Sequence, residues 1–344
     1  MCKQVFVHFC TWFKTLERSG KWEMWNSEYP QNPHNPDIIL YNGKRDIAAT
    51  DYPLMGVYDS GDNYVIETQM KLIKACGIDG IIVDWDGTEL NPYRHETFLK
   101  LIPYLIKHNL KLIICFEEWC GYYPKGLVKT RKSELNNIID QLNWLSQNIL
   151  CENFYARING KKPLLAFRKI PKKLLSASEW EYVKAACDSD ISYLFEDCRD
   201  DSFKSAADGW FFWTGGFDKY NSSSLSYNLK RLDTFIQKCR ENDPQKIILP
   251  GIRPGFDDTP VWGWGQYPRI APRYDGNRYI KLWKRVLDGF DAVQILTWND
   301  WNEGSQIEPS EKYGVKYLSL TKKYISKFKN INSDNTNFIR LLKK

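Results

Sequence analysis

The stretch VFVHFCTWF, at residues 5–13, is rich in β-branched and aromatic residues and is the first of eight such runs in the chain. Short apolar runs of this kind are typical of strands in a parallel sheet whose two faces are both covered. The seven later runs are GIDGIIVDW (77–85), LKLIICFEEW (110–119), KPLLAFRK (162–169), ISYLFED (191–197), DGWFFWTGG (208–216), KIILPGIRPGF (246–256) and AVQILTWND (292–300).

Amphipathic helices are predicted between these runs. Ile66, Met70 and Ile73 recur at helical spacing, and apolar residues over 135–149 do the same, which marks one buried stripe per helix. Ser133 stands at the expected N-cap of the second of these helices. Strands that alternate with helices predict an α/β fold.

Two arrangements of eight alternating strands and helices compete, an open doubly wound sheet and a closed barrel. An open sheet usually carries a Gly-rich phosphate turn after its first strand, and no GxGxxG follows residues 5–13. A long segment rich in Trp, Asn and Pro follows instead (18–55), and a second lies at 252–274. We therefore predict a single (β/α)8 TIM barrel over residues 1–344, with long Trp- and Pro-rich loops after strands 1 and 7.

Composition excludes several partners. The chain has 344 residues, and its 48 basic and 42 acidic side chains give a net charge of +6 that is spread along the sequence, so no nucleic-acid partner is expected. No apolar run approaches the roughly 20 residues of a membrane helix, so no membrane insertion is expected. Nine cysteines without regular spacing favour reduced thiols and a cytoplasmic location, whereas a removed leader would imply a periplasmic or secreted protein.

No local motif predicts a metal site or a cofactor. The four histidines, His8, His34, His95 and His108, show no HExxH or HxH spacing, and the cysteines show no CxxC. A GxSxG nucleophile elbow is also absent. We expect neither metal nor cofactor, and we expect His8, inside the first run, to be a core residue.

Acidic residues recur where the predicted strands end. The pairs are Asp84 and Asp86, Glu117 and Glu118, Glu196 and Asp197, Asp257 and Asp258, and Asp300 and Glu303. For any single pair, a helix N-cap, a loop salt bridge or a solvated turn is the favoured explanation. Because the carboxyl ends of barrel strands meet at the active site, five such pairs favour a site built from carboxylates, which glycosidic bond cleavage requires.

Tryptophan residues also follow the predicted strands, and flat indole rings pack against the apolar faces of sugars. Core packing is the alternative explanation for aromatic residues, and it accounts for many of the 14 Trp and 20 Tyr of the chain. The residues at or just beyond strand ends are Trp12, Trp85, Trp119, Trp213, Trp298 and Trp301. We predict that they contact an oligosaccharide or polysaccharide substrate.

Five strings along the chain resemble, in order, motifs of family 99 glycoside hydrolases and of the related family 71 and WbsX-type proteins. They are YPLMGVYDSGD (52–62), GIDGIIVDWDG (77–87), IICFEEW (113–119), PGFDDT (254–259) and WNDWNEGSQIEP (298–309). The last string is the most specific. The resemblance implies a retaining endo-α-mannosidase-like activity on a complex glycan or polysaccharide.

The resemblance also implies roles for individual residues. Asp300 would deprotonate the sugar 2-hydroxyl to give a 1,2-anhydro sugar, and Glu303 would act as general acid and base. The family usually has Glu where this chain has Asp300, a side chain shorter by one methylene. Substrate contacts are implied for Glu117, Asp257 and Asp258, and the same strings contain the remaining candidate substrate-binding residues, Tyr58, Asp59, Asp84 and Asp86.

Alternatives to this interpretation remain open. The spacing of Asp300 and Glu303 brings their side chains to one side only on a helical turn, and a capping arrangement with Asn299 or Asp300 as cap would explain the segment without catalysis. At the level of function, the alternatives are a glycosyltransferase or transglycosylase of polysaccharide biosynthesis and a non-catalytic carbohydrate-binding barrel.

Overall fold

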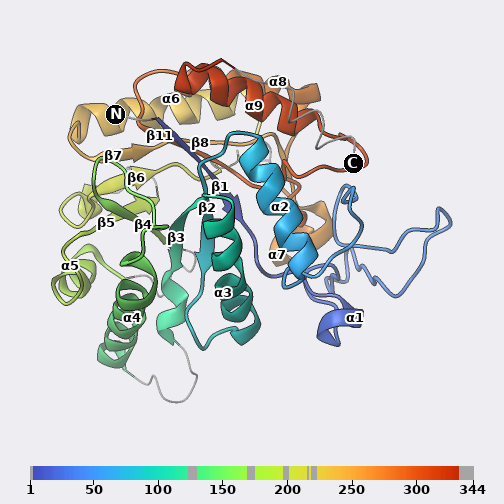
Figure 1. Cartoon of the computed structure of the whole chain (residues 1–344), viewed down its shortest axis with the longest axis horizontal. Coiled ribbons are helices and arrows are strands. Elements are labelled where there is room, and N and C mark those ends of the chain that lie inside the picture. The colour runs from blue at the N-terminus through green and yellow to red at the C-terminus, as the bar shows by residue number, and fades with distance from the viewer. Residues whose placement is uncertain are drawn as a thin grey trace.

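A parallel, barrel-shaped sheet forms the centre of the computed structural model, which describes residues 3–122, 130–168, 175–196, 201–214, 217 and 223–332 (Figure 1). Its segments are β1 (Gln4–Phe9), β2 (Gly80–Trp85), β3 (Lys111–Glu117), β4 (Lys162–Phe167), β5 (Ile191–Glu196), β6 (Gly209–Phe211), β7 (Ile247–Leu249), β8 (Gly251–Ile252) and β11 (Ala292–Ile295). Each of the eight predicted runs contributes to this sheet.

The sheet is nearly closed. Its order is β7-β6-β5-β4-β3-β2-β1-β11-β8, so that its two end segments are adjacent in the chain and are separated only by Pro250. Proline has no N–H for the ladder, which explains the interruption of the predicted run 246–256. The Pro250 carbonyl still accepts a hydrogen bond from Gln294 N at 3.0 Å. The predicted TIM-barrel class is confirmed.

Side chains along each strand alternate between the barrel interior and the surrounding helices. Phe6 of β1, Ile82 of β2 and Ile113 of β3 belong to the cluster inside the barrel. Their neighbours, such as Val7 and Val83, belong to the larger cluster that the helices cover. This parity decides which of the polar residues near the strand ends can face the interior.

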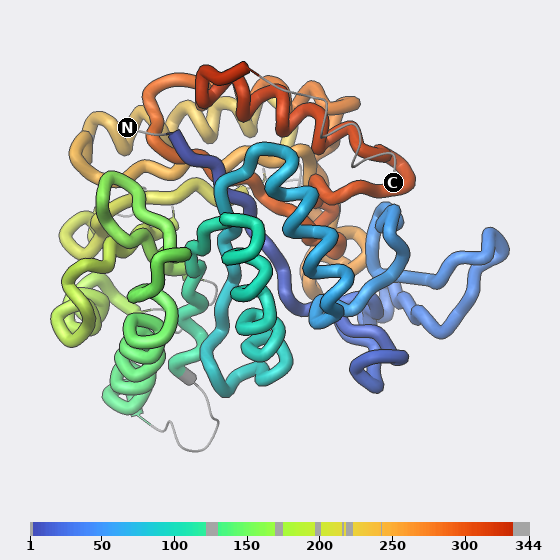
Figure 2. Tube along the Cα trace, in the orientation of Figure 1, coloured from blue at the N-terminus to red at the C-terminus, as the bar shows by residue number. Residues whose placement is uncertain are grey.

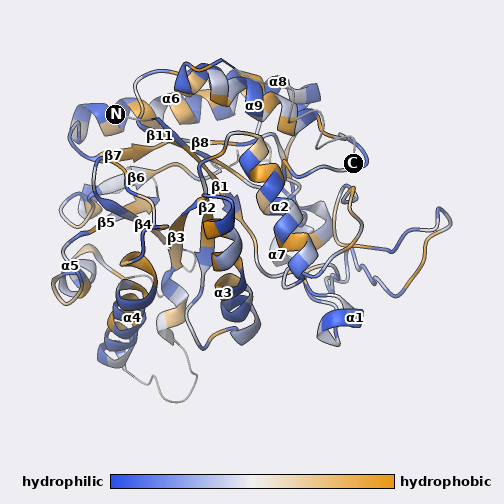
Figure 3. Cartoon of the chain, in the orientation of Figure 1, coloured by the Kyte–Doolittle hydropathy of each residue, from blue (hydrophilic) through white to orange (hydrophobic). Residues whose placement is uncertain are grey.

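The helices pack around the outside of the sheet, and their exposed sides are hydrophilic, whereas strands such as β7 are largely hydrophobic (Figure 3). Their bounds are α2 (Asn63–Ala75), α3 (Pro92–Lys107), α4 (Arg131–Leu145), α5 (Ala177–Ala185), α6 (Leu225–Asn242), α8 (Asn277–Val286) and α9 (Lys316–Lys329). The N-cap of α4 is Thr130, and Ser133 is instead the third helical residue of a reciprocal capping box, because its hydroxyl reaches back to the Thr130 N–H.

Two long loops extend from the sheet, as predicted. The first connects β1 to α2, contains only the short helix α1 (Leu16–Ser19), and projects from the body of the molecule (Figure 2). The second connects β8 to α8 and contains the two-stranded pair β9 (Phe256–Asp257) and β10 (Ile270–Ala271), and α7 (Trp262–Gly265). Across the described residues, no helix combines the length and the apolar character needed to cross a membrane.

Candidate active site

Three acidic side chains occupy positions of β2, β3 and β5 that the alternation of side chains turns toward the barrel interior. Asp84, Glu117 and Glu196 each lie two residues, or a multiple of two, beyond a side chain of the inner cluster. The Cys115 thiol is buried beside them, and its pKa is raised well above the usual value by burial and then by the charges of Asp84, Glu117 and Glu196. The structure therefore gathers acids from three strands at one end of the barrel. Asp197 lies outside the described residues.

Asp300 and Glu303 lie on the turn that follows β11. The Asp300 N–H donates to Thr297 Oγ1 at 2.9 Å, and the Glu303 N–H donates to Asp300 Oδ1 at 2.9 Å. One half of the expected capping arrangement is thus present, with Asp300 as the cap, whereas the Asp300 N–H is bound by Thr297 and not by the side chain of Glu303. The carboxylate of Glu303 accepts a hydrogen bond from Trp264 Nε1 at 3.0 Å and lies 3.7 Å from an Arg269 nitrogen.

The carboxylates of Asp300 and Glu303 act electrostatically on the same buried thiol as Asp84. The Cys10 thiol is buried just beyond β1, and its pKa is raised well above the usual value by burial, then by the charges of Asp300, Asp84 and Glu303. All three acids therefore lie within electrostatic range of this thiol. The hydrogen bond from the Glu303 N–H to Asp300 Oδ1 is therefore compatible with a role of Asp300 in this shared electrostatic environment.

The chain is similar to several known proteins. A family model described as "Glycosyltransferase WbsX" matches residues 214–321. Rat glycoprotein endo-alpha-1,2-mannosidase is 26% identical over 347 residues, which cover 91% of this chain and 70% of the rat protein. The mouse protein of the same name is 24% identical and covers 94% and 75%, respectively. The chain is a distant homologue of these endo-α-mannosidases.

The solved structure of a family GH99 endo-α-mannosidase from Bacteroides thetaiotaomicron, in complex with bis-tris-propane, has the same fold. It superposes with a TM-score of 0.72 at 18% identity, and the match covers 95% of this chain and 97% of that one. The fold of this chain, a mannosidase homologue, therefore resembles that of the bacterial enzyme over almost its whole length.

Three tryptophans that were expected to contact sugar are buried. Trp85 has the opposite parity to Asp84, and its ring stacks on Trp144 of α4 with centroids 5.8 Å apart. Trp298 and Trp301 have no exposed surface. The prediction of direct sugar contact is corrected for these three rings, which pack the walls of the barrel and of the first long loop.

Four polar candidates are also committed to internal contacts. Tyr58 is buried and donates to Glu308 Oε2 at 2.8 Å. Asp59 is buried and accepts hydrogen bonds from Ser19, Tyr93 and backbone N–H groups. Asp86 pairs with Arg94 at 3.1 Å, and the fully buried Asp258 pairs with Arg269 at 2.6 Å. Their geometry supports positioning of the loops and not direct contact with a substrate.

The other candidates lie where a substrate could reach them. Five of them are partly exposed, and Glu117 is 5% exposed at the end of β3. The partly exposed side chains are Asp84, Trp12, Trp119, Trp213 and Asp257. Trp213 packs edge-on against His8, with ring centroids 4.7 Å apart. Substrate contact stays a prediction for these six residues.

The second long loop contributes groups that the sequence did not single out. Trp264 and Arg269 approach the Glu303 carboxylate, and the buried Arg253 guanidinium also lies within its electrostatic range. The Asp257 N–H donates to the Glu303 carbonyl at 2.7 Å. Gly304 has a φ of 55°, and a Cβ there would lie 3.0 Å from the Asp257 carbonyl oxygen, so glycine permits this close approach.

We expect Trp264→Phe to lower kcat/KM about tenfold, because a hydrogen bond to a charged group contributes about 1.5–3 kcal/mol and this one is partly exposed to water. Trp262→Phe, in the same helix α7, is the matched control, since its indole is not the donor to Glu303. Steady-state kinetics on one substrate measures both variants. Equal losses in the two variants would show that the loop does not tolerate the replacement of either indole ring. The loss in Trp264→Phe would then not be attributable to this hydrogen bond.

Glu308 is a second residue that the sequence did not identify. It is buried in the QIEP part of the last motif, where burial raises its pKa to about 7 although Gln69, Tyr58 and Trp301 all donate hydrogen bonds to it. Gln69 belongs to α2, Tyr58 to the first long loop and Trp301 to the turn after β11. Asp300 and Glu303 lie on this turn. Through its hydrogen bonds, Glu308 connects the turn to the rest of the barrel.

This raised pKa predicts a pH dependence of stability. Between pH 4.5, the ordinary pKa of the carboxyl, and about 7, the folded protein holds a proton at Glu308 that the unfolded chain releases, so the free energy of unfolding falls as pH rises. One such group contributes up to roughly 3 kcal/mol. In urea denaturation at pH 5 and pH 8, we expect the stability advantage of the wild type over Glu308→Gln to shrink at pH 8, and a constant advantage would contradict the assignment.

Proposed function

We propose that this chain is a glycoside hydrolase that cleaves α-mannosidic bonds within a glycan or polysaccharide. The observation that carries the proposal is the position of Asp300 and Glu303, two acidic side chains held on one turn at the carboxyl end of the barrel, which act electrostatically on the same buried thiol as Asp84. Glycosidic cleavage requires two carboxyl groups at the bond, one to protonate the leaving oxygen. The names of the curated relatives support mannose as the sugar.

In the proposed reaction, Asp300 removes the proton from the 2-hydroxyl, and the 2-oxygen attacks the anomeric carbon as the glycosidic bond breaks. Glu303 gives its proton to the leaving oxygen, and then takes a proton from the water that attacks the anomeric carbon of the 1,2-anhydro sugar. As the bond between the anomeric carbon and the 2-oxygen breaks, Asp300 returns its proton to the 2-oxygen. Two inversions at one carbon give net retention. The fixed hydrogen bond from the Glu303 N–H to Asp300 Oδ1 supports this division, because it holds the base in one orientation.

Asp300 is one methylene shorter than the Glu that its family usually carries. The shorter side chain is 5% exposed, and its backbone is anchored through Thr297 Oγ1. We propose that the backbone of the turn places Asp300 closer to the sugar and so compensates for the shorter side chain.

The proposal is tested by incubating the protein with α-linked manno- and gluco-oligosaccharides and following the first-formed anomer by NMR. We expect release of a product from manno-oligosaccharides with the α-configuration retained. First formation of the β-anomer would refute the retaining mechanism, and cleavage of gluco-oligosaccharides alone would refute the choice of sugar. Saturable binding of oligosaccharide without any new reducing end would favour a non-catalytic carbohydrate-binding barrel.

A glycosyltransferase is the second candidate, and the description of the family model that matches residues 214–321 favours it. Such an enzyme needs a site for an activated sugar donor. Titration with nucleotide sugars, in the absence of acceptor, separates the two candidates: saturable binding would favour transfer, and no binding together with oligosaccharide cleavage would favour hydrolysis. A cytoplasmic location stays a prediction.

A further inference from the structure

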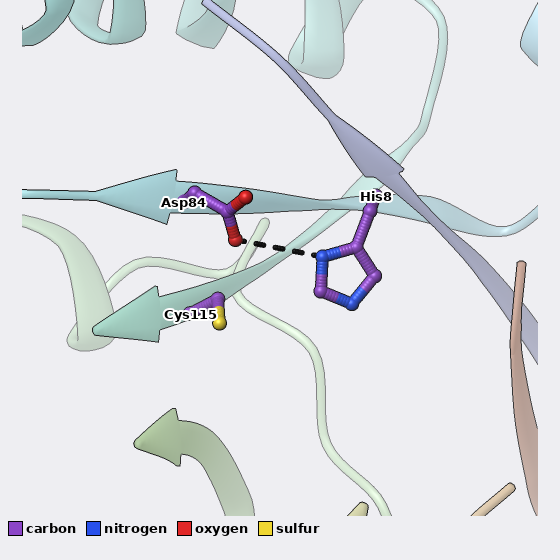
Figure 4. Close-up of side chains that lie close together, drawn as sticks. All are labelled: His8, Asp84 and Cys115. Carbon is purple, nitrogen blue, oxygen red and sulfur yellow. Dashed lines mark ion pairs between the residues drawn. The ribbon is translucent and has the colours of Figure 1, made fainter. Parts of the chain in front are cut away.

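Three side chains of different chemical type meet inside the barrel, one on each of three neighbouring strands. His8 of β1, Asp84 of β2 and Cys115 of β3 offer a nitrogen, an oxygen and a sulfur atom that all lie within 4.8 Å of one another (Figure 4). Register explains the meeting, because Asp84 is directly paired with Cys115, and His8 is paired with Ile82, which has the same parity. The sequence concealed this cluster, since its members are far apart in the chain.

The hydrogen bonds of His8 fix which ring nitrogen faces the cluster. Gln294 Nε2 donates to the Phe212 carbonyl at 2.8 Å, so its Oε1 is the atom that meets His8 Nε2 at 2.8 Å and accepts its proton. His8 Nδ1 is then left with a lone pair in the neutral ring. This buried nitrogen has no hydrogen-bond partner, and it lies 3.5 Å from Asp84 Oδ1.

A lone pair directed at a carboxylate is unfavourable unless a positive charge lies between them. A proton on Nδ1 is one solution, and a metal ion is the other. Tetrahedral zinc, with ligands at about 2.0–2.3 Å, holds its nitrogen, oxygen and sulfur ligands about 3.3–3.6 Å apart. The separation of Nδ1 and Oδ1, 3.5 Å, already fits this spacing, and the other separations, which are at most 4.8 Å, must shorten when the ion binds.

The choice of atoms selects the kind of cation. Magnesium and calcium prefer oxygen ligands, whereas imidazole and thiolate favour zinc and its neighbours among the transition metals. The surrounding field also favours a cation, because Glu117 and Glu196 act on Cys115 together with Asp84. Asp84 is partly exposed, with 16% of its side chain accessible, so an incoming ion has a route from solvent.

We propose that His8, Asp84 and Cys115 bind a thiophilic divalent cation, of which Zn²⁺ is the representative, at the floor of the barrel. Binding forms bonds to His8 Nδ1, one Asp84 oxygen and Cys115 Sγ, and the thiol proton leaves to the solvent. A water molecule completes the fourth position on the side of Asp84 that faces solvent. If the proposed hydrolase function holds, zinc and glycan compete for Asp84, so that zinc inhibits the enzyme.

Direct titration of the full chain with Zn²⁺, in the absence of any glycan, tests the site independently of the proposed function. Isothermal titration calorimetry in two buffers of different ionisation enthalpy gives the stoichiometry, the affinity and the number of protons released. All proteins carry serine at Cys2, Cys151 and Cys198, so that these three thiols do not contribute to the measured binding. We expect one Zn²⁺ per chain and proton release, and titration with Co²⁺ is expected to give the near-ultraviolet absorption of a cobalt–thiolate bond.

Two variants and one matched control complete the test. Cys115→Ser and Asp84→Asn keep the shape of the side chains, and each is expected to weaken Zn²⁺ binding by more than tenfold, since loss of even an outer-shell partner costs about 10–100-fold. Cys76→Ser alters another fully buried thiol, at the end of α2, and is expected to bind as the parent does. Circular dichroism verifies that each variant folds.

The proposal is overturned if the parent binds less than one Zn²⁺ per chain, or if Cys115→Ser and Cys76→Ser bind it equally well. If Cys115→Ser does not fold, Asp84→Asn provides the test, and an unchanged affinity of that variant for Zn²⁺ overturns the proposal. Hydrolysis without zinc binding would refute this site and leave the proposed function in place. Zinc binding without hydrolysis would support this site and count against the proposed function.

Discussion

Glu303→Gln is expected to lower kcat for hydrolysis of a manno-oligosaccharide by about 10²–10⁴-fold, the usual contribution of a positioned general acid and base. Gln keeps the size of the side chain and an oxygen that can accept from Trp264 Nε1, so binding of the glycan should change little. Kinetics and calorimetric binding on the same substrate separate the two effects. The variant should recover part of its activity on α-mannosyl fluoride, because fluoride leaves without a proton.

Glu311→Gln is the matched control for this prediction. Glu311 lies eight residues further along the chain, is 40% exposed and pairs with Lys44 on the surface. Its neutralisation should leave kcat unchanged. Full activity in Glu303→Gln would remove the proposed acid, and an equal loss in both variants would point to the charge of the whole segment.

Asp300→Asn is expected to lower kcat by a similar factor, about 10²–10⁴-fold, on both oligosaccharide and fluoride substrates. Asn keeps an oxygen that can accept the hydrogen bond from the Glu303 N–H, so the turn should be retained while the base is lost. The comparison of substrates is the important measurement, because only loss of the base persists when the leaving group needs no proton. Recovery of Asp300→Asn on the fluoride would therefore exchange the two roles.

Asp300→Glu tests the departure from the usual family residue. If the backbone of the turn supplies the reach, the longer side chain is displaced, and kcat should fall. An increase in kcat would show instead that the native aspartate is too short. Unfolding in urea serves as the control for both variants, since a change in kcat without a change in stability isolates the position of the carboxylate.

The barrel could be predicted from the sequence because its signals are local. Each strand is a short apolar run, and each helix has one apolar stripe, as in Ile66, Met70 and Ile73, which are all fully buried. The end of a strand is less well marked, because apolar residues continue into the loop. The first run extends to Phe13, yet β1 ends at Phe9.

The candidate site could be predicted only in part. Acidic residues at strand ends identified Asp84 and Glu117, whereas Trp85 was assigned to the site although the alternation of β2 turns it toward α4. That error was avoidable, since Asp84 and Trp85 are consecutive and cannot both face the interior. The pairing of Trp264 with Glu303 depends on loop geometry, in which Trp264 has a φ of 57°, and no sequence pattern encodes it.

The two hydrogen bonds that join Glu303 to the segment between β8 and α8 have a consequence for how relatives of this chain can diverge. Trp264 holds the carboxylate and Asp257 holds the peptide carbonyl of the same residue, so that an insertion, deletion or exchange in that segment re-aims the acid as well as reshaping the entrance. We therefore expect that a chimera designed to change the substrate must receive both this segment and the turn at 298–309 together. Separate exchange of either piece would yield barrels that fold and do not turn over.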